Sequence, residues 1–334
     1  MEAVDVNINK CKEVSHIFKE LTNRIPIDSF TDERFYPPKG TDTELVTRYF
    51  MFMVAIDHRT SRYRPFEAIV DGQLYHGADL LYKLGMKKFT RDPEFFSPER
   101  MAKITPAEVA SWLSVKGIDG EVITVWDYEA RAKLLNDLGS KILDGYGGSC
   151  YRVILLSGNY LKRDGRGFID RLKAFKAYSD PVEKKAYLLV KFLNRRGILT
   201  FTDVDNAEVP VDNHVSRIAL RLGLIELSDN YFNKILMREP FTEYEDIMIR
   251  SKIRDAFKVI SYFAGVSPLI LDDLLWMFGR DCCTRGRPAC IAPSNSGCVK
   301  LGMWRDGCPF SNQCILLSKG VLIDEHLFED TYYY

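Results

Sequence analysis

The sequence predicts a mostly α-helical protein with one small β-hairpin and a cysteine-rich loop near its C-terminus. Many segments of the 334-residue chain have apolar side chains that recur every three or four positions, which is the spacing of one helix face. The hairpin is expected at residues 66–75, where two apolar runs flank Asp71-Gly72, a strong signal for a tight turn. Six of the eight cysteines fall within residues 281–314.

The expected elements follow one another along the chain. The first clear helix covers residues 41–56, and Ser97-Pro98 and Thr105-Pro106 each start a helix, because a capping residue precedes a proline at the first helical position. Residues 116–125 are expected to form a loop or short hairpin. Further helices are expected over residues 78–84, 127–143, 167–178, 183–194, 212–222, 242–264 and 268–278.

This order of elements suggests three regions. Residues 1–150 form an N-terminal helical region with the small hairpin, residues 151–280 form a second helical region, and residues 281–334 hold the cysteine loop and the tail. The chain has no run of about 18 apolar residues and no secretory signal at its start, so we expect no membrane span and a cytoplasmic location. In such a reducing compartment, cysteines bind metals or clusters more often than they form disulfides.

The charge is balanced, with 46 basic and 46 acidic residues. Proteins that hold duplex DNA through its phosphates normally carry a basic surplus. The balance therefore argues against tight non-specific binding to DNA, although it is compatible with a local basic face.

The cysteines of the loop occur in two spaced pairs. Six residues separate Cys283 from Cys290, and five separate Cys308 from Cys314. Four thiolates brought together by short loops suit an iron–sulfur cube. A zinc site also takes four soft ligands, usually as two close pairs, and a disulfide-linked tail is the third interpretation.

A carboxylate at a predicted helix start is the second informative feature. Asp212 follows the extended apolar approach of Val209 to Val211 and begins the helix expected over residues 212–222. A carboxylate fixed there can stabilise positive charge developing on a sugar or orient the attacking water. Aspartate is also a common helix cap, so a purely structural role remains open.

The cysteine spacings resemble the C-x6-C-x2-C-x5-C loop of the iron–sulfur helix-hairpin-helix DNA glycosylases, and the lead-in at residues 274–280 is similar as well. Where that family has two residues between its second and third cysteines, this chain has the 17 residues 291–307. The resemblance implies a [4Fe–4S] cluster on Cys283, Cys290, Cys308 and Cys314. Cys282 and Cys298 are the substitute ligands.

The same family resemblance extends to the chemistry-bearing residues. Val209–Val215, read VPVDNHV, is similar to the V-D-x-H segment that holds the family's catalytic aspartate, which implies this role for Asp212. Asn213 and His214 are then expected to contact substrate. Residues 183–189 resemble the second helix of the hairpin, which implies that Lys184 is the Schiff-base lysine of bifunctional members. The alternative is that Lys184 and Lys185 are solvated surface lysines.

Two departures from the family pattern concern DNA. The hairpin turn reads Ser179-Asp180-Pro181-Val182, without the glycines that let backbone amides approach a phosphate, and Asp180 would repel one. Lys184 and Asp212 are also 28 positions apart (212 − 184), which is longer than usual. Both departures weaken the case for duplex DNA while leaving sugar chemistry at Asp212 open.

A second resemblance covers most of the chain. The queuosine salvage proteins, which release the queuine base from its nucleotide, are similar in short collinear pieces but lack the cysteine loop. These pieces are residues 55–57, 72–77, 80–81, 146–149, 184–186, 212, 222–223, 245–250 and 271–276. Both resemblances imply cleavage of an N-glycosidic bond at Asp212.

The expected function is therefore an N-glycosidase that releases a modified or damaged purine-like base. The resemblance to the first family implies a DNA glycosylase, with AP-lyase activity if Lys184 forms a Schiff base. The resemblance to the second implies a queuosine-nucleotide hydrolase. A non-catalytic protein that binds nucleic acid or a nucleotide is the third hypothesis.

Overall fold

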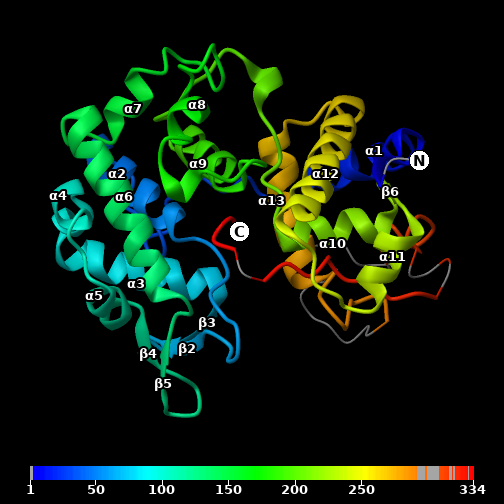
Figure 1. Ribbon diagram of the computed structural model, residues 1–334, viewed down its shortest axis with the longest axis horizontal. Helices are drawn as coiled ribbons and strands as arrows, with labels where there is room; N and C mark the ends of the chain where they lie inside the picture. Colours follow the sequence, from blue (N-terminus) through cyan, green and yellow to red (C-terminus); the bar gives the residue numbers. More distant parts are fainter. Residues whose placement is uncertain (1–2, 292–297, 299–307, 316–317, 319, 330) are drawn as a thin grey trace. The chain divides into compact units, whose positions relative to one another are not determined.

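The computed structural model describes residues 3–291, 298, 308–315, 318, 320–329 and 331–334. The described chain is mostly helical, with short two-stranded antiparallel pairs, and this confirms the predicted class (Figure 1). It forms two compact units. The cysteine unit comprises residues 1–27 and 207–331, and the lysine unit comprises residues 28–206 and 332–334. Both are discontinuous in sequence, so their boundaries differ from the contiguous regions 1–150, 151–280 and 281–334.

The cysteine unit joins the start of the chain to its last third. Strand β1 (Val4–Val6) pairs antiparallel with β6 (Ile225–Leu227), with Val4 opposite Leu227. Helix α1 (Ile8–Thr22) packs against α12 (Glu243–Ala264), where Phe18 meets Phe257 edge to face at 6.0 Å between ring centroids. The unit is completed by α10 (Asn213–Leu222), α11 (Asp229–Leu236) and α13 (Pro268–Asp281).

Helix α10 is the most deeply buried element of this unit. Asp212 caps its N-terminus, and Gly223 ends it in the left-handed conformation with φ 66°. Every residue from Val215 to Leu222 is buried, including two arginines. The helix packs mainly against α13, which leads into the cysteine loop. The start of α10 is therefore linked to the cysteine loop through the packing of α10 on α13.

The lysine unit is built round α2 (Thr43–Ala55), whose residues from Tyr49 onward are all buried. Helix α9 (Lys184–Arg195) packs on α2, and their contact includes Phe50 and Phe192 at 5.1 Å between centroids. The remaining helices are α3 (Gly77–Arg91), α4 (Pro98–Met101), α5 (Pro106–Trp112), α6 (Tyr128–Tyr146), α7 (Tyr151–Leu155) and α8 (Phe168–Leu172).

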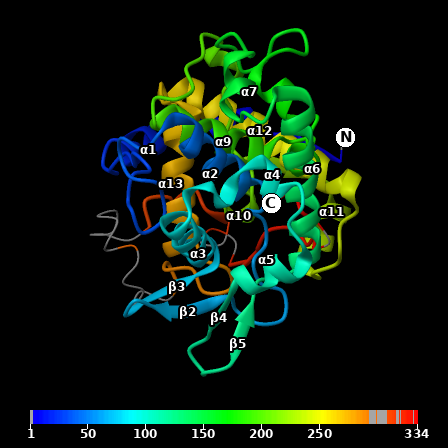
Figure 2. The same cartoon turned by 90° about the vertical axis from the view of Figure 1, so that its left-hand side faces the viewer.

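Two β-hairpins lie at the same end of this unit (Figure 2). The predicted hairpin is β2 (Glu67–Val70) with β3 (Gln73–His76), joined by Asp71-Gly72. The second is β4 (Ser114–Lys116) with β5 (Val122–Thr124), in the segment where a loop or hairpin was expected.

The helix expected over residues 167–178 is shorter than predicted. It divides into α8 and the 3-10 turn Lys176–Tyr178, because Phe175 between them has an extended backbone. Phe175 and Tyr178 are both buried there, and the Tyr178 hydroxyl donates a hydrogen bond to the Met51 carbonyl at 2.7 Å. Tertiary packing therefore overrides the local helical pattern.

Among the described residues, no single helix combines the length and hydropathy that a membrane crossing requires. The two helices α12 and α13, which are bent by 113° to each other, meet the criteria only when they are taken together.

Candidate functional site

Asp212 is held by one oxygen and leaves the other available. Its Oδ1 accepts a hydrogen bond from the Val215 amide at 3.0 Å, so the capping role is real. Among the described residues, Oδ2 has no hydrogen-bond partner, and the side chain is only partly buried. The buried Val209 and Val211 anchor the approach to it. The carboxylate is thus fixed through one oxygen, while the other has no hydrogen-bond partner in the described part of the chain.

His214 lies two residues further on, at the start of α10. Its Nδ1 is 2.9 Å from Nη2 of Arg217, so Nδ1 accepts and the ring proton belongs on Nε2. Burial lowers the pKa of His214 from its ordinary value, and the nearby Asp212 carboxylate opposes that shift. A Cβ added at Gly279 would lie 2.7 Å from Cβ of His214, so the close approach of α13 requires glycine there.

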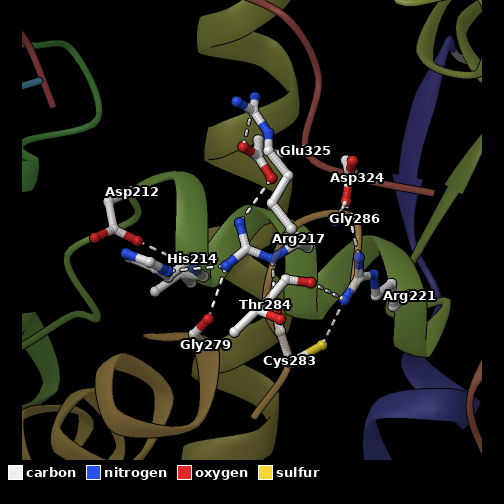
Figure 3. A network of polar contacts seen from close by, with 12 residues as sticks. Asp212, His214, Arg217, Arg221, Gly279, Cys283, Thr284, Gly286, Asp324 and Glu325 are labelled. Atoms are coloured by element: carbon white, nitrogen blue, oxygen red, sulfur yellow. Dashed lines mark hydrogen bonds and ion pairs between the residues drawn. The ribbon is translucent and has the colours of Figure 1, made fainter. Parts of the chain in front are cut away.

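Arg217 connects this end of α10 to the cysteine loop and the tail. It donates to the carbonyl oxygens of Gly279 (2.8 Å) and Cys283 (2.7 Å) and to Glu325 at 2.7 Å (Figure 3). Burial raises the pKa of Glu325, but Arg217 and Arg285 together hold it below its usual value. The pair is therefore ionised and buried, which fixes the Arg217 side chain.

Arg221, one turn later, contacts a predicted metal ligand directly. Its guanidinium donates to Sγ of Cys283 at 3.1 Å and to the Thr284 carbonyl at 3.0 Å. It also pairs with Asp324 at 2.8 Å (Figure 3). Donors of this kind stabilise a thiolate, whether the sulfur is free or bound to a metal.

The four predicted ligands line one cavity. Cys283, Cys290, Cys308 and Cys314 all carry thiol side chains, whereas the two substitute ligands form a disulfide with each other. The other walls come from α10, α13 and the loop; they are Ile218, Arg221, Leu222, Phe278, Cys282, Pro288 and Phe310. Four sulfurs and apolar walls are the donor set and surroundings that an iron–sulfur cluster requires.

The arrangement around this cavity is compact. Its volume is about 20 Å³, and among the described residues no group of three or more His, Cys, Asp or Glu side chains has the spacing of a metal site. Burial raises the pKa of Cys308 to about 12, and the other three sulfurs add to the shift. A raised pKa keeps this thiol protonated, so a metal centre on these four sulfurs would have to displace protons when it binds.

The lysines of α9 belong to the lysine unit, and neither is a solvated surface residue. Lys185 is fully buried and Lys184 is 7% exposed. Nζ of Lys184 donates to the Asp57 carbonyl at 3.3 Å. Nζ of Lys185 donates to the Ala55 carbonyl at 2.6 Å and lies 3.3 Å from Nδ1 of His58.

Lys185 has the features of a neutral amine. An ammonium has three N–H groups, but in the described structure Nζ has two hydrogen-bond partners and no carboxylate among them. Burial lowers the pKa of Lys185 well below its ordinary value, and the charges of Lys184 and Arg131 add to this. A neutral amine that uses both N–H groups keeps its lone pair for attack.

The turn before α9 does not offer free amides. Asp180 accepts hydrogen bonds from the amides of Val182 (3.0 Å) and Lys184 (2.9 Å). Glu183 has a left-handed backbone, φ 65°, and its buried carboxylate pairs with Lys162 and Lys173, each at 2.7 Å. A carboxylate therefore satisfies the amides that a glycine-rich hairpin would present to a phosphate.

The structure thus gathers most of the predicted residues in one unit. Asp212, Asn213, His214 and the four cysteines lie in the cysteine unit, joined by α10 and its two arginines, whereas Lys184 lies in the lysine unit. Sequence reasoning missed Lys185, although its spacing to Leu189 and Leu193 places it on the buried face of α9. His58 and the arginines of α10 carried no such signal.

No family model matches the chain, and no curated protein matches it either. Solved structures of similar shape include endonuclease III trapped as a covalent intermediate with DNA. It is 15% identical, with a TM-score of 0.47 over 93% of this chain and 98% of that one. Another is the 8-oxoguanine DNA glycosylase of Pyrobaculum aerophilum complexed with 8-oxoguanosine, 15% identical, with a TM-score of 0.46 over 90% of this chain and 97% of that one.

Proposed function

We propose that this protein is an N-glycosidase that releases a modified or damaged purine-like base, as a DNA glycosylase does. The observation that carries the proposal is the Asp212 carboxylate, whose Oδ1 is fixed by the Val215 amide while Oδ2 has no partner among the described residues. A carboxylate oriented before the reaction stabilises charge as it develops, without reorganising.

The chemistry at Asp212 follows from that geometry. As the bond between base and sugar lengthens, positive charge grows on the anomeric carbon, and the carboxylate stabilises it. Asp212 also orients the attacking water and takes its proton. We place Asn213 and His214 at the same helix start as substrate contacts; neutral His214 offers its Nε2 hydrogen to a sugar or phosphate oxygen.

A lysine of α9 supplies the second reaction, Schiff-base formation with a sugar aldehyde. Lys184 is the residue that the sequence resemblance implies, but the contacts favour Lys185, whose amine is buried, neutral and hydrogen-bonded through both N–H groups. Its Nζ adds to the aldehyde carbon, and loss of water leaves the imine. Such an imine precedes strand cleavage in a lyase reaction.

We further propose that Cys283, Cys290, Cys308 and Cys314 hold a [4Fe–4S] cluster with a structural role. The proposal is supported by the cavity that the four cysteines share and by the contact of Arg221 with Sγ of Cys283. Hydrolysis at a sugar carbon transfers no electrons, so the cluster would act by holding the loop against α10 and α13. Arg217 and Arg221 of α10 both contact Cys283, so an ordered loop would also fix the position of α10.

A specific observation favours a second substrate. Because Asp180 occupies the amides of the turn before α9, this turn cannot bind a backbone phosphate as a glycine-rich hairpin does. A free nucleotide such as queuosine monophosphate has no DNA backbone, so its binding does not require phosphate contacts from this turn. Queuosine-nucleotide hydrolysis is therefore the alternative function at the same carboxylate.

Base release from defined substrates separates these functions. Duplexes that carry one damaged purine, and separately queuosine monophosphate, are incubated with the protein and the free base is measured. Release from the duplex supports repair, and release from the monophosphate supports salvage. No release from either substrate contradicts both and leaves a binding protein.

A further inference from the structure

A buried polar cluster surrounds Lys185 in the lysine unit. Its centre is His58, which is 3% exposed and follows α2 in the lysine unit. Nδ1 of His58 faces Nζ of Lys185 at 3.3 Å. On the other side of the ring, Nε2 is buried and has no hydrogen-bond partner in the described structure. Buried ring nitrogens are rarely left this way, so the arrangement requires an explanation.

A carboxylate oxygen of Asp127 lies near that nitrogen. Its Oδ2 lies 3.9 Å from Nε2 of His58, about 1 Å beyond a hydrogen bond. Asp127 precedes α6 with a left-handed backbone, φ 62°. A non-glycine residue held in this region costs stability, which is common where a side chain is positioned for function.

Asp127 also has the properties of a proton acceptor in contact with water. Its side chain is 28% exposed, whereas that of His58 is fully buried. Burial raises the pKa of Asp127 above its ordinary value, against the opposing charge of Arg131. A proton that reaches this carboxylate can therefore leave to solvent.

The charges around His58 keep the ring itself neutral. Burial lowers the pKa of His58 well below its ordinary value, and nearby cations add to the effect. The charged and titratable groups that face the cluster are Asp57, Asp127, Arg131, Asp180, Lys184 and Lys185, with the ring of Tyr332 at 6.0 Å from Nζ of Lys185. A neutral ring can accept a proton on one nitrogen and give one from the other.

We propose that Lys185, His58 and Asp127 form a proton relay that serves the Schiff-base chemistry proposed above. The neutral Nζ of Lys185 adds to the aldehyde carbon, and the nitrogen, which now carries a positive charge, gives a proton to Nδ1 of His58 while Nε2 passes its own to Oδ2 of Asp127. The ring ends as the other tautomer and Asp127 becomes a neutral acid. The reverse transfer returns that proton to the alkoxide oxygen, and the second proton of the nitrogen leaves with this hydroxyl as water, which gives the imine. His58 and Asp127 are positioning residues, because they act through Lys185.

The relay is tested on the full-length protein with a small aldehyde, glycolaldehyde, and cyanoborohydride. The rate of Lys185 modification is measured from pH 4 to pH 9 by peptide mapping, an assay that needs no nucleotide substrate. The variants are Asp127→Asn, which keeps the shape but accepts no proton, and His58→Asn, which keeps an acceptor for Lys185 but lacks Nε2. Asp119→Asn, an exposed aspartate paired with Arg64, is the matched control.

The expected result is a wild-type rate that falls at acid pH with a midpoint above the ordinary 3.8 of aspartate. Asp127→Asn should lose that acid limb and react about 100-fold more slowly at neutral pH, the scale of one proton-transfer group. His58→Asn should be equally slow, and the double variant no slower than either single one, because both residues serve one relay. Asp119→Asn should match the wild type.

An acid limb retained in Asp127→Asn would overturn the relay. So would multiplicative losses in the double variant, or a wild-type Lys185 that does not react. Denaturation curves for each variant identify any that fails to fold, and His58→Gln then replaces His58→Asn. If Lys185 reacts with glycolaldehyde as expected but never with an abasic sugar, the Schiff-base function fails while the relay stands.

Discussion

The proposed chemistry depends on single polar side chains whose neighbours use only part of their hydrogen-bonding capacity. Asp212 uses one oxygen to cap α10, and its other oxygen has no hydrogen-bond partner among the described residues, so the capping and catalytic interpretations of this residue are compatible. Within the part of the chain that the structure describes, the amine of Lys185 has two acceptors and no carboxylate partner, which favours the neutral form. For both residues, the set of hydrogen-bond partners indicates the proposed chemical role.

The buried amine of Lys185 should be visible in the stability of the protein. Its pKa is lowered on folding from the ordinary 10.5, so between these two values the unfolded chain binds a proton that the folded chain lacks. The free energy of unfolding should therefore rise with pH in that window, by up to about 1.4 kcal/mol per pH unit. Urea denaturation of the wild type and of Lys185→Met gives this slope by difference.

The comparison is made below about pH 9, because buried thiols such as Cys11, with a pKa raised to about 11, reverse the slope above it. Lys185→Met should lack the lysine contribution. Lys184→Met should keep it over a narrower window, since the charge of Lys184 helps to lower the pKa of Lys185. Equal pH dependence in the wild type and in Lys185→Met would show that Lys185 is charged in the folded state.

At the scale of elements, α10 is the part that connects the two chemical features of the cysteine unit. Its first turn holds Asp212, and its buried arginines hold the tail and the cysteine loop. Loss of such an arginine leaves a buried carboxylate without one of its partners, which is costly even where a pair contributes little net stability.

Arg217→Met should therefore lower the free energy of unfolding by about 3 kcal/mol. Arg285 pairs with the same Glu325 at 2.8 Å, but its side chain is 51% exposed, so Arg285→Ala should cost less than about 1 kcal/mol. Urea denaturation of both variants measures the contrast. Similar losses in the two variants would mean that burial of Arg217 does not determine the stability of this helix.

How much of an element could be predicted depended on local signals. Turn and capping chemistry is local, so it could be predicted from the sequence. Examples are the hairpin at Asp71-Gly72, the helix starts at Ser97 and Thr105 and the cap at Asp212. The pairing of β1 with β6 could not be predicted, since three-residue strands distant in sequence carry no periodic pattern.

The sites divide in the same way. Residue type and spacing single out Asp212 and the cysteines as candidates, and their catalytic and metal-binding roles stay predictions. The choice between Lys184 and Lys185 depends on which face of α9 packs on α2, and the partners of His58 come from segments about 70 and 130 positions away. Such non-local contacts leave no local trace in the sequence.

At the scale of the whole molecule, the two units place different chemistry in different parts of the chain. The cysteine unit holds the carboxylate and the four thiols, and the lysine unit holds the buried amine and its relay. If the four cysteines hold a cluster, the stability of the cysteine unit should depend on it, because the free energy of metal binding to thiolates adds to the free energy of folding.

The purified protein should accordingly carry about four irons per chain together with inorganic sulfide. Cys308→Ser should lose most of the iron and destabilise the protein. Cys150→Ser changes a buried free cysteine of the lysine unit and should keep the iron. Metal analysis after anaerobic purification checks this; one zinc per chain without iron would contradict the cluster.

The central claim, that the Asp212 carboxylate stabilises a sugar cation, is tested most directly by affinity for a cation mimic. The dissociation constant is measured for a protonated pyrrolidine in place of the sugar and for its neutral tetrahydrofuran counterpart, both within a DNA duplex and as free 5′-phosphates. In one of these contexts the wild type should prefer the cation at least tenfold, about 1.4 kcal/mol. Asp212→Asn, which preserves the helix cap, should lose the preference. Equal affinity for both mimics in the wild type, or a preference that survives in Asp212→Asn, would contradict the account.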